Sequence, residues 1–461
     1  MSFKPAQNPS FSLYQARRAQ LVQTIKDQFK GKQGKIILLG AFEQEASRFK
    51  QESSFYYLTG LNEPGLVLIL DLDGRSTLMI PNCVTTRAQW VHSIIPLEQK
   101  NAQIFGFDTI AYLGAECTGY QFYPFSPKAE YEQLVNYVQN IVANNQALFT
   151  LTPNNSDEYI QQRMQLLRFA EWIPNLLNAC IDISSIIAHM RRKKDMDEIE
   201  LLYKAVEITV LAQEAAAQAI KPGITEAEVQ ASLEYMMVAS GAQPSFPSIV
   251  AGGKNGTVLH YMANSDMLKP DQLVIVDIGA EFAHYCADLT RTYPVSGRFT
   301  KRQKELYNLV LETQEYIASI AKPGMWLSNK EKPEQSLNHL AKKYLDERGY
   351  GSYFIHGIGH FLGLDVHDVG DYKRPLQEGD VITIEPGIYI PGEKIGIRIE
   401  DNYWIVKDGV VCLSEYLPKK AEEIEEFMQE GMNQEEQGSE QEPDEYDSEE
   451  DEDSSEDFAH G

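Results

Sequence analysis

The sequence predicts a mixed α/β (α+β) protein made of two folded domains and an acidic tail. The chain has 461 residues, which is more than one hydrophobic core ordinarily serves. Its hydrophobic fraction of 43% is that of a globular protein. Segments with the apolar spacing of amphipathic helices alternate with short apolar runs typical of strands. We expect the first domain at 1–181, the second at 182–428 and the tail at 429–461.

The first domain is expected to be an α/β unit. The stretch FSLYQARRAQLVQTIKDQF (11–29) has helical apolar spacing, and GKIILLGAF (34–42) has the pattern of a short buried strand. Residues 53–81, SSFYYLTGLNEPGLVLILDLDGRSTLMIP, contain strand-like apolar runs separated by turn residues. Two further helices are predicted over 127–147 and 157–171.

The second domain is expected to begin with helices and to end with strands. Residues 182–220 are mostly helical by pattern and stop at Lys-Pro-Gly (221–223), and Thr225 is a capping residue for a helix over 226–241. A long helix is predicted over 301–321. The predicted strands lie at 247–253, 273–279, 284–295, 381–390, 395–406 and 410–417.

The negative charge of the chain is concentrated in the tail. The net charge is −26, and residues 429–461 contain fifteen acids and no lysine or arginine. The remainder has 41 basic and 52 acidic residues, a net charge of −11. The tail has too little apolar surface to offset the entropy of ordering, so we expect it to be disordered. No nucleic acid partner is expected, because no basic stripe is present to neutralise phosphates.

The composition also predicts where in the cell the protein is found. The sequence has no run of eighteen apolar residues and no N-terminal signal pattern, so we expect a soluble, cytoplasmic protein that does not associate with membranes. The cysteines are scattered and form no CxxC pair, which predicts neither a disulfide framework nor a thiolate zinc site. The five are Cys83, Cys117, Cys180, Cys286 and Cys412.

Several acids lie inside apolar strand-like segments. Asp277 occurs in LVIVDIGAE, Glu385 in VITIEPG and Glu400 in IGIRIED. A single acid of this kind is usually at a strand end or faces solvent. An ionised carboxylate within an apolar strand is costly unless it is paired or bound to a metal. Several such acids together therefore favour a metal site.

The spacing of the acids predicts two facing pairs. Asp277 and Asp288 lie eleven residues apart around an expected hairpin tip at 282–283, which would place them directly opposite each other, about 5 Å apart. Glu385 and Glu400 lie fifteen apart around the turn sequence PGEK. Pro386, next to Glu385, lacks an N–H and invites a bulge there.

Two facing carboxylate pairs repel unless cations lie between them. Four carboxylates balance two divalent ions, and oxygen with imidazole ligands suits Mn²⁺, Co²⁺ or Zn²⁺. The segment HGIGHFLGLDVHDVG (356–370) offers His356 and His360 at the i,i+4 spacing of a helical zinc motif. Its glycines disfavour a helix, so we expect a strand or loop in which one of the two histidines binds metal. A histidine taken singly in such a segment is more often a structural, hydrogen-bonded residue.

These stretches together resemble a known family. The chain resembles the Xaa-Pro aminopeptidases (aminopeptidase P), in the metallopeptidase group with the pita-bread fold that includes prolidase, methionine aminopeptidase and creatinase. The resemblance covers about residues 10–428. The stretches that carry it are SRFKQESSFYYLTGLNEPG (47–65), LHYMAN (259–264), VDIGAEFAHYCADLTRTYPVSGRFT (276–300), HGIGHFLGLDVHDVG, TIEPGIYI (383–390) and GIRIEDN (396–402).

The resemblance implies an N-terminal aminopeptidase P-like domain, a pita-bread catalytic domain and a set of metal ligands. Asp277 would chelate one metal, Asp288 and Glu400 would bridge both, and His360 and Glu385 would complete the other. The ions would be two divalent metals per subunit, Mn²⁺ first and Co²⁺ or Zn²⁺ as alternatives.

Further residues match positions that the family uses around the metals. His260, His356 and His367 match histidines that contact the substrate or support the site, and Arg398 and Tyr389 match supporting positions. The implied reaction is hydrolysis of the bond between an N-terminal residue and a following proline by a hydroxide held between the metals. Glu385 would move the proton to the proline nitrogen. The implied partners are peptides with proline in second position and further copies of this chain in a dimer or tetramer.

The chain departs from the family pattern at two places. His284 stands where the family commonly has glycine, and we expect this change to be tolerated at a hairpin tip. The residues after Trp90, VHSIIP, replace a Gly-Arg-Arg run, which puts an oligomer contact in doubt.

Two other functions are considered for this pattern of residues. An Xaa-Pro dipeptidase would share all five ligands. A non-catalytic pita-bread binding protein would be expected to lose at least one of them, and none is lost here.

Overall fold

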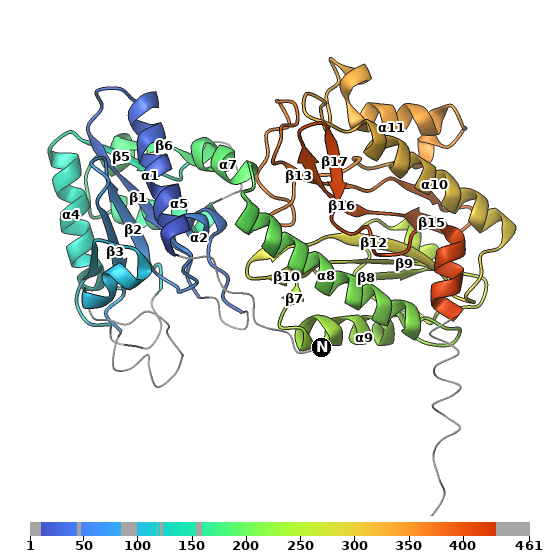
Figure 1. Ribbon diagram of the computed structural model, residues 1–461. Coiled ribbons are helices and arrows are strands. Elements are labelled where there is room, and N and C mark those ends of the chain that lie inside the picture. Colours follow the sequence, from blue (N-terminus) through green and yellow to red (C-terminus); the bar gives the residue numbers. More distant parts are fainter. Residues whose placement is uncertain are drawn as a thin grey trace, which may run out of the picture.

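A six-stranded mixed sheet organises the first lobe of the protein (Figure 1). The computed structural model describes residues 11–43, 48–83, 99–117, 119, 123–153 and 159–429. Within the sheet, β2 is antiparallel to both of its neighbours, and the remaining pairs are parallel. Its order is β4 (Thr109–Tyr112), β3 (Ser76–Ile80), β2 (Val67–Asp71), β1 (Gly34–Leu39), β5 (Ala147–Thr150) and β6 (Cys180–Asp182).

Helices cover both faces of this sheet, because strand β1 is apolar on both faces. Ile36 and Leu38 belong to the core cluster that includes helix α1, whereas Ile37 and Leu39 belong to the cluster that includes helices α4 and α5. This alternation follows from the two-residue period of a strand. The helical segments are α1 (Phe11–Gln28), α2 (Ser53–Thr59), α4 (Glu132–Ala143), α5 (Ile160–Ala170), α6 (Leu176–Ala179), η1 (Gln99–Phe105) and η2 (Lys128–Tyr131).

One prediction for this lobe is wrong. The run SSFYYLT was expected to be strand-like, but it forms helix α2. The Glu52 carboxylate accepts hydrogen bonds from the backbone N–H groups of Ser54 and Phe55, which caps the start of the helix. Gly60, with a φ of 68°, ends it. The capping pattern therefore outweighs the β-propensity of the aromatic run.

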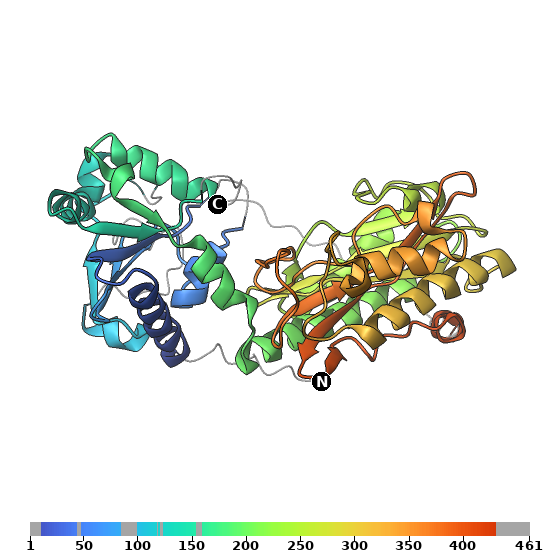
Figure 2. The ribbon, with the colours of Figure 1, turned by 90° about the horizontal axis from the view of Figure 1, so that it is seen from above.

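The second lobe contains short antiparallel sheets with helices packed on them (Figures 1 and 2). Helix α8 packs against strands β9–β12, and α10 packs against strands of the β13–β17 group. The mixed α/β architecture predicted from the sequence is confirmed. Helix α7 (Ser184–Arg192) leads from the first lobe to the second and packs on α1 and α2 (Figure 1). The helical segments of the second lobe are α8 (Met196–Ala219), α9 (Glu226–Ala239), η3 (Gly253–Thr257), α10 (Lys301–Ile320), η4 (Pro333–Gln335), α11 (Leu337–Asp346), η5 (Gly351–Tyr353) and residues 421–429. The strands are β7 (Gln243–Pro244), β8 (Ile249–Gly252), β9 (Leu273–Ile278), β10 (Ala280–Phe282), β11 (Tyr285–Cys286), β12 (Leu289–Pro294), β13 (Val381–Ile384), β14 (Gly387–Ile390), β15 (Ile395–Arg398), β16 (Asp401–Val406) and β17 (Gly409–Cys412).

The register of the first hairpin differs from the prediction. Asp277 pairs with Thr290 rather than with Asp288. The turn lies at Ala283 and His284, which have φ values of 48° and 72°, and not at 282–283. When the tip of a hairpin moves by one residue, each residue faces a partner two positions further along the other strand. Asp277 and Asp288 therefore lie on the same face of the hairpin, but diagonally and not directly opposite each other.

The second pair of acids follows the predicted register. Strands β13 and β16, and strands β14 and β15, pair in one continuous register, in which Glu385 is opposite Glu400. The named strands break at these residues and at Pro386, as a residue without an N–H predicts.

The two lobes contact each other close to the first hairpin. The Lys50 ammonium lies 2.6 Å from Glu281 Oε2, and the ring centroids of Tyr56 and His284 are 3.9 Å apart. Seen from above, the lobes lie side by side (Figure 2). Among the described residues, no helix combines the length and the apolar character needed to cross a membrane. Trp90, its flank and residues 430–461 lie outside the described residues.

Candidate metal centre

The residues predicted to form the site meet around one cavity of about 730 Å³ in the second lobe. They arrive from β9, from the segment before β12, from the loop after η5 and from the segments that flank β14 and β15. The cavity lining includes His260, Asp277, Asp288, His356, His360, His367, Glu385, Arg398 and Glu400.

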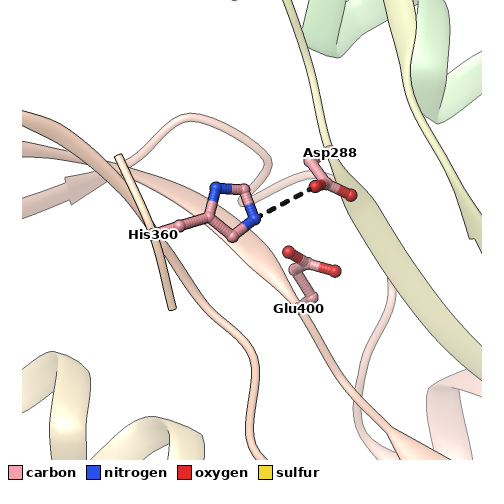
Figure 3. Close-up of side chains that lie close together, drawn as sticks. All are labelled: Asp288, His360 and Glu400. Atoms are coloured by element: carbon pink, nitrogen blue, oxygen red, sulfur yellow. Dashed lines mark ion pairs between the residues drawn. The ribbon is translucent and has the colours of Figure 1, made fainter. Parts of the chain in front are cut away.

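Three of these residues form a compact cluster of metal-ligating atoms. One ligand atom each of Asp288, His360 and Glu400 lies within 4.8 Å of the other two (Figure 3). His360 Nε2 is 3.3 Å from Asp288 Oδ2. The other ring nitrogen of His360 lies 3.1 Å from the carbonyl oxygen of Phe361, which orients Nε2 toward the carboxylates. Gly359 makes this approach possible, because a Cβ there would lie 2.0 Å from the carbonyl oxygen of Thr383.

The other two predicted ligands lie at the edge of this cluster. Glu385 Oε1 is 3.6 Å from His360 Nε2 and accepts a hydrogen bond from the Thr383 hydroxyl at 3.3 Å. Asp277 Oδ2 accepts a hydrogen bond from Arg398 Nη2 at 2.6 Å. One oxygen of Asp277 is thus already paired with a guanidinium.

Two buried carboxylate oxygens in the site have no partner. Within the part of the chain that the structure describes, Asp277 Oδ1 and Glu400 Oε1 are buried and receive no hydrogen bond. Buried polar oxygens are almost always satisfied in folded proteins, so such exceptions need an explanation. A divalent cation accepts lone pairs from these oxygens and supplies the missing partner. The donor set therefore fits a metal.

The raised pKa values of the carboxyl groups also indicate that the site needs cations. Burial raises the pKa of Glu400 well above its usual range, and Asp288 and Glu385 add to the effect. Burial raises the pKa of Asp288 to about 6, and burial together with Asp288 raises that of Glu385 to about 7. Without cations the crowded carboxylates would tend to hold protons near neutral pH. Bound divalent ions would restore their charged forms.

His356 belongs to a different arrangement, behind the cluster. Its Nε2 lies 2.9 Å from the Tyr389 hydroxyl, which also accepts a hydrogen bond from Arg398 Nη1 at 2.7 Å. Its Nδ1 lies 2.8 Å from the carbonyl oxygen of Gly357 and 3.6 Å from Glu385 Oε2. Burial and the nearby Arg398 lower the pKa of His356 to about 4, so the imidazole is neutral at pH 7.

The remaining two histidines lie on the cavity wall. The His367 ring is nearly perpendicular to that of His360, with the centroids 4.3 Å apart. Burial and His360 lower the pKa of His367. His260 follows η3 in a loop and is exposed. Both imidazoles therefore border the space that a substrate would occupy.

Sequence reasoning missed several residues of the site. Thr290 donates a hydrogen bond to Glu400 Oε2 at 2.7 Å and accepts one from Arg398 Nε at 3.2 Å. Its position two residues after Asp288, on the same strand face, could have indicated it. Lys50 and Asp365 also line the cavity. Lys50 comes from the first lobe, and no pattern in the sequence indicates that it would reach this site.

Comparisons with known proteins agree with the architecture. The profile of metallopeptidase family M24 matches residues 200–407, and that of the aminopeptidase P N-terminal domain matches residues 14–115. The Xaa-Pro aminopeptidase of Haemophilus influenzae is 32% identical over 408 residues, which cover 82% of this chain and 88% of that protein. The Xaa-Pro dipeptidase of Pyrococcus furiosus is 40% identical over 237 residues, which cover 50% of this chain and 66% of that protein. The structure of Escherichia coli aminopeptidase P with the inhibitor Pro-Leu has a TM-score of 0.75 at 27% identity and covers 93% of this chain and 100% of that one.

Proposed function

This chain belongs to metallopeptidase family M24 and is a metal-dependent aminopeptidase, and we propose that the cavity described above is its catalytic centre. Its substrates are peptides with proline in second position, and it cleaves the bond before that proline. The resemblance found in the sequence is confirmed by the match of both profiles and by relatives that span most of the chain.

The residues proposed to hold two divalent ions are Asp277, Asp288, His360, Glu385 and Glu400. The observation that carries this assignment is the pair of buried, unpartnered oxygens on Asp277 and Glu400. Mn²⁺ is the proposed metal, because the donor set is rich in oxygen with a single imidazole, and Co²⁺ and Zn²⁺ are the alternatives. When bound, the two ions would acidify a shared water and polarise the carbonyl group of the substrate.

Glu385 is proposed to move the proton during hydrolysis. Its carboxylate lines the cavity, so an oxygen that is not held by a metal can accept and release a proton beside the substrate. It would take a proton from the attacking water and deliver it to the proline nitrogen. That nitrogen needs the proton, because it leaves as an amine and not as a strongly basic anion.

His356 is proposed to stabilise the negative charge that develops on the carbonyl oxygen. If the Tyr389 hydroxyl donates to Nε2, then Nδ1 carries the proton. This Nδ1 lies 2.8 Å from the carbonyl oxygen of Gly357 and 3.6 Å from Glu385 Oε2, so the substrate oxygen would have to replace Gly357 as the acceptor of this proton. Arg398 donates to Tyr389 and would hold this chain of contacts in place.

His260 and His367 are proposed to contact the substrate. They border the cavity together with the apolar side chains of Phe246, Leu259 and Met262. A prolyl ring offers no N–H to read, so a pocket selects it by shape. Flat imidazoles and apolar walls suit this requirement.

An Xaa-Pro dipeptidase is the second candidate, because the P. furiosus relative has the higher identity, over about half of this chain. The aminopeptidase reading is favoured by relatives that match 82% of the chain and by the N-terminal profile. The test is cleavage of Gly-Pro-Xaa tripeptides and of the dipeptide Gly-Pro by metal-loaded protein, before and after chelation. We expect chelator-sensitive release of glycine from the tripeptide. Cleavage of Gly-Pro alone would favour the dipeptidase, and no cleavage of either would favour the non-catalytic binding protein.

We further propose domain limits at 1–181, 182–428 and 429–461, assembly into a dimer or tetramer, and a cytoplasmic location. Light scattering of the purified protein measures the assembly directly, and a monomeric mass at micromolar concentration would contradict it.

A further inference from the structure

Two buried glutamines hold equivalent positions behind the two pairs of acidic residues. Gln213 on α8 donates from Nε2 to the carbonyl oxygen of Val276 at 3.1 Å and to that of Leu289 at 3.0 Å. Val276 directly precedes Asp277, and Leu289 directly follows Asp288. One amide group thus joins the two strands that carry the first acidic pair.

The second glutamine repeats this arrangement in the other half of the lobe. Gln314 on α10 donates from Nε2 to the carbonyl oxygen of Ile384 at 3.1 Å and to that of Ile399 at 3.3 Å. These residues directly precede Glu385 and Glu400. Each pair of acidic residues therefore has its own side-chain amide bridge, supplied by a helix on which its strands pack.

The two amide bridges lie where the backbone pairing between strands is interrupted. Ile399 donates its N–H to the carbonyl oxygen of Pro386, but Pro386 has no N–H to return, so the Ile399 carbonyl needs another donor. Gln314 supplies it. In the first half, the hairpin is interrupted at Gly279, between β9 and β10, and Gln213 joins the two strands beside this gap.

Both amide groups are fixed in orientation. The side chains of Gln213 and Gln314 are 0% exposed. Gln213 Oε1 accepts a hydrogen bond from the Tyr293 hydroxyl at 3.0 Å, and Gln314 Oε1 accepts one from the Lys419 ammonium at 3.3 Å. With the oxygen held from one side, both N–H groups are directed to the strands. Neither amide can rotate without leaving buried groups unsatisfied.

We propose that Gln213 and Gln314 are positioning residues of the metal centre, each of which sets the spacing of one pair of acidic ligands. This inference rests on the proposed function, in which these acids hold two divalent ions. Metal affinity depends on ligand positions to a few tenths of an ångström, and groups that orient the ligands affect it strongly. Neither glutamine contacts the substrate cavity, so they act through the strands.

The test replaces each glutamine by methionine, which has a similar volume and no donor. We expect Gln213→Met and Gln314→Met to raise the Kd for Mn²⁺ by about tenfold or more, measured by calorimetry on the metal-free protein. The visible spectrum of the Co²⁺-loaded protein should change as well, since it reports ligand geometry and not overall stability. Thr313→Val is the matched control, because Thr313 is equally buried on α10 but bonds within its own helix, to Leu309. Its Kd and spectrum should equal those of the wild type.

A milder variant serves if the methionine variants do not fold. Tyr293→Phe removes only the hydroxyl that orients Gln213, and we expect about a fivefold higher Kd for Mn²⁺, the worth of one hydrogen bond. Folded variants with the Kd and the Co²⁺ spectrum of the wild type would overturn the inference. A wild-type protein that binds no divalent ion would instead overturn the proposed function.

Discussion

Arg398 Nη2 lies 2.6 Å from Asp277 Oδ2, and the same guanidinium contacts the Tyr389 hydroxyl through Nη1. One arginine therefore links a proposed metal ligand to the side chain that contacts His356. The two parts of the site, the acidic cluster and the imidazole behind it, are held in one frame by this planar group.

The first prediction concerns this link. Arg398→Lys keeps the charge but can make only part of the forked contact. We expect kcat to fall by about tenfold or more while metal content stays near that of the wild type. The matched control is Arg302→Lys, since Arg302 makes an exposed ion pair with Glu393. Steady-state kinetics with metal analysis checks this, and an unchanged kcat for Arg398→Lys would contradict it.

The second prediction concerns His356. His356→Ala should leave metal content unchanged and strongly reduce kcat, because we propose that this imidazole stabilises developing charge and holds no metal. His339→Ala is the control, since His339 is bonded to Ser336 on α11, outside the cavity lining. Loss of metal from the His356 variant would mean that His356 and His360 exchange roles.

The third prediction is a pH dependence of stability. Burial lowers the pKa of His284 to about 4, below its ordinary value of 6.5. Neutral His284 therefore contributes stability that is present above pH 6.5 and is lost as the pH falls toward 4. Asn tolerates the positive φ of this position, so His284→Asn should remove roughly 2 kcal/mol of the fall in unfolding free energy between about pH 7 and pH 5.

Denaturant unfolding of both proteins at the two pH values measures this difference. Glu281, Lys50, Arg48 and Asp365 are the charged groups that act on His284, and they remain in both proteins. Equal pH dependence in wild type and variant would show that His284 does not titrate in this window.

The fourth prediction concerns the C-terminus. Residues 421–429 form a helix whose Ala421, Ile424 and Met428 are fully buried in the main core. Removal of 430–461 should therefore leave the unfolding midpoint and the cleavage of neutral peptides nearly unchanged. At low salt, the truncated protein should cleave acidic peptides faster than the full chain does, because the acids of the tail no longer repel them. In 0.1 M salt this repulsion is screened over about 10 Å.

A longer truncation provides the contrast. Removal of 421–461 takes the buried helix away and should lower stability by several kcal/mol, as expected for loss of three core side chains. If the shorter truncation also lost metal or melted much earlier, the tail would have a structural role.

Part of the site was predictable because it depends on the pattern of neighbouring residues in the sequence. Acids within apolar strands indicated the proposed ligands, and the turn after β14 determined the register of Glu385 and Glu400. The first hairpin was misjudged by one residue at its tip, because Ala283 and His284 are not typical residues for a positive φ, and only the family's glycine at the position of His284 pointed to the true turn. A shift of this size changes which residues face each other without changing the face.

Contacts between distant segments were not predictable. Lys50 reaches the cavity from the other lobe, and Gln213 bonds to strands more than sixty residues away. A buried glutamine in a helix has the same sequence appearance as a surface one. Only the packing of α8 and α10 on the strands gives these residues their place.

The central claim is that the acidic cluster holds the divalent ions on which cleavage depends. Titration of Mn²⁺ into the metal-free wild type, Asp288→Ala and Glu281→Ala tests it most directly. Glu281 is a buried carboxylate on the same hairpin, paired with Lys50, and serves as the control. We predict two ions per chain for the wild type and for Glu281→Ala, and for Asp288→Ala a loss of metal together with a loss of Gly-Pro-Xaa cleavage. An Asp288→Ala protein with full metal occupancy and retained turnover would contradict the account.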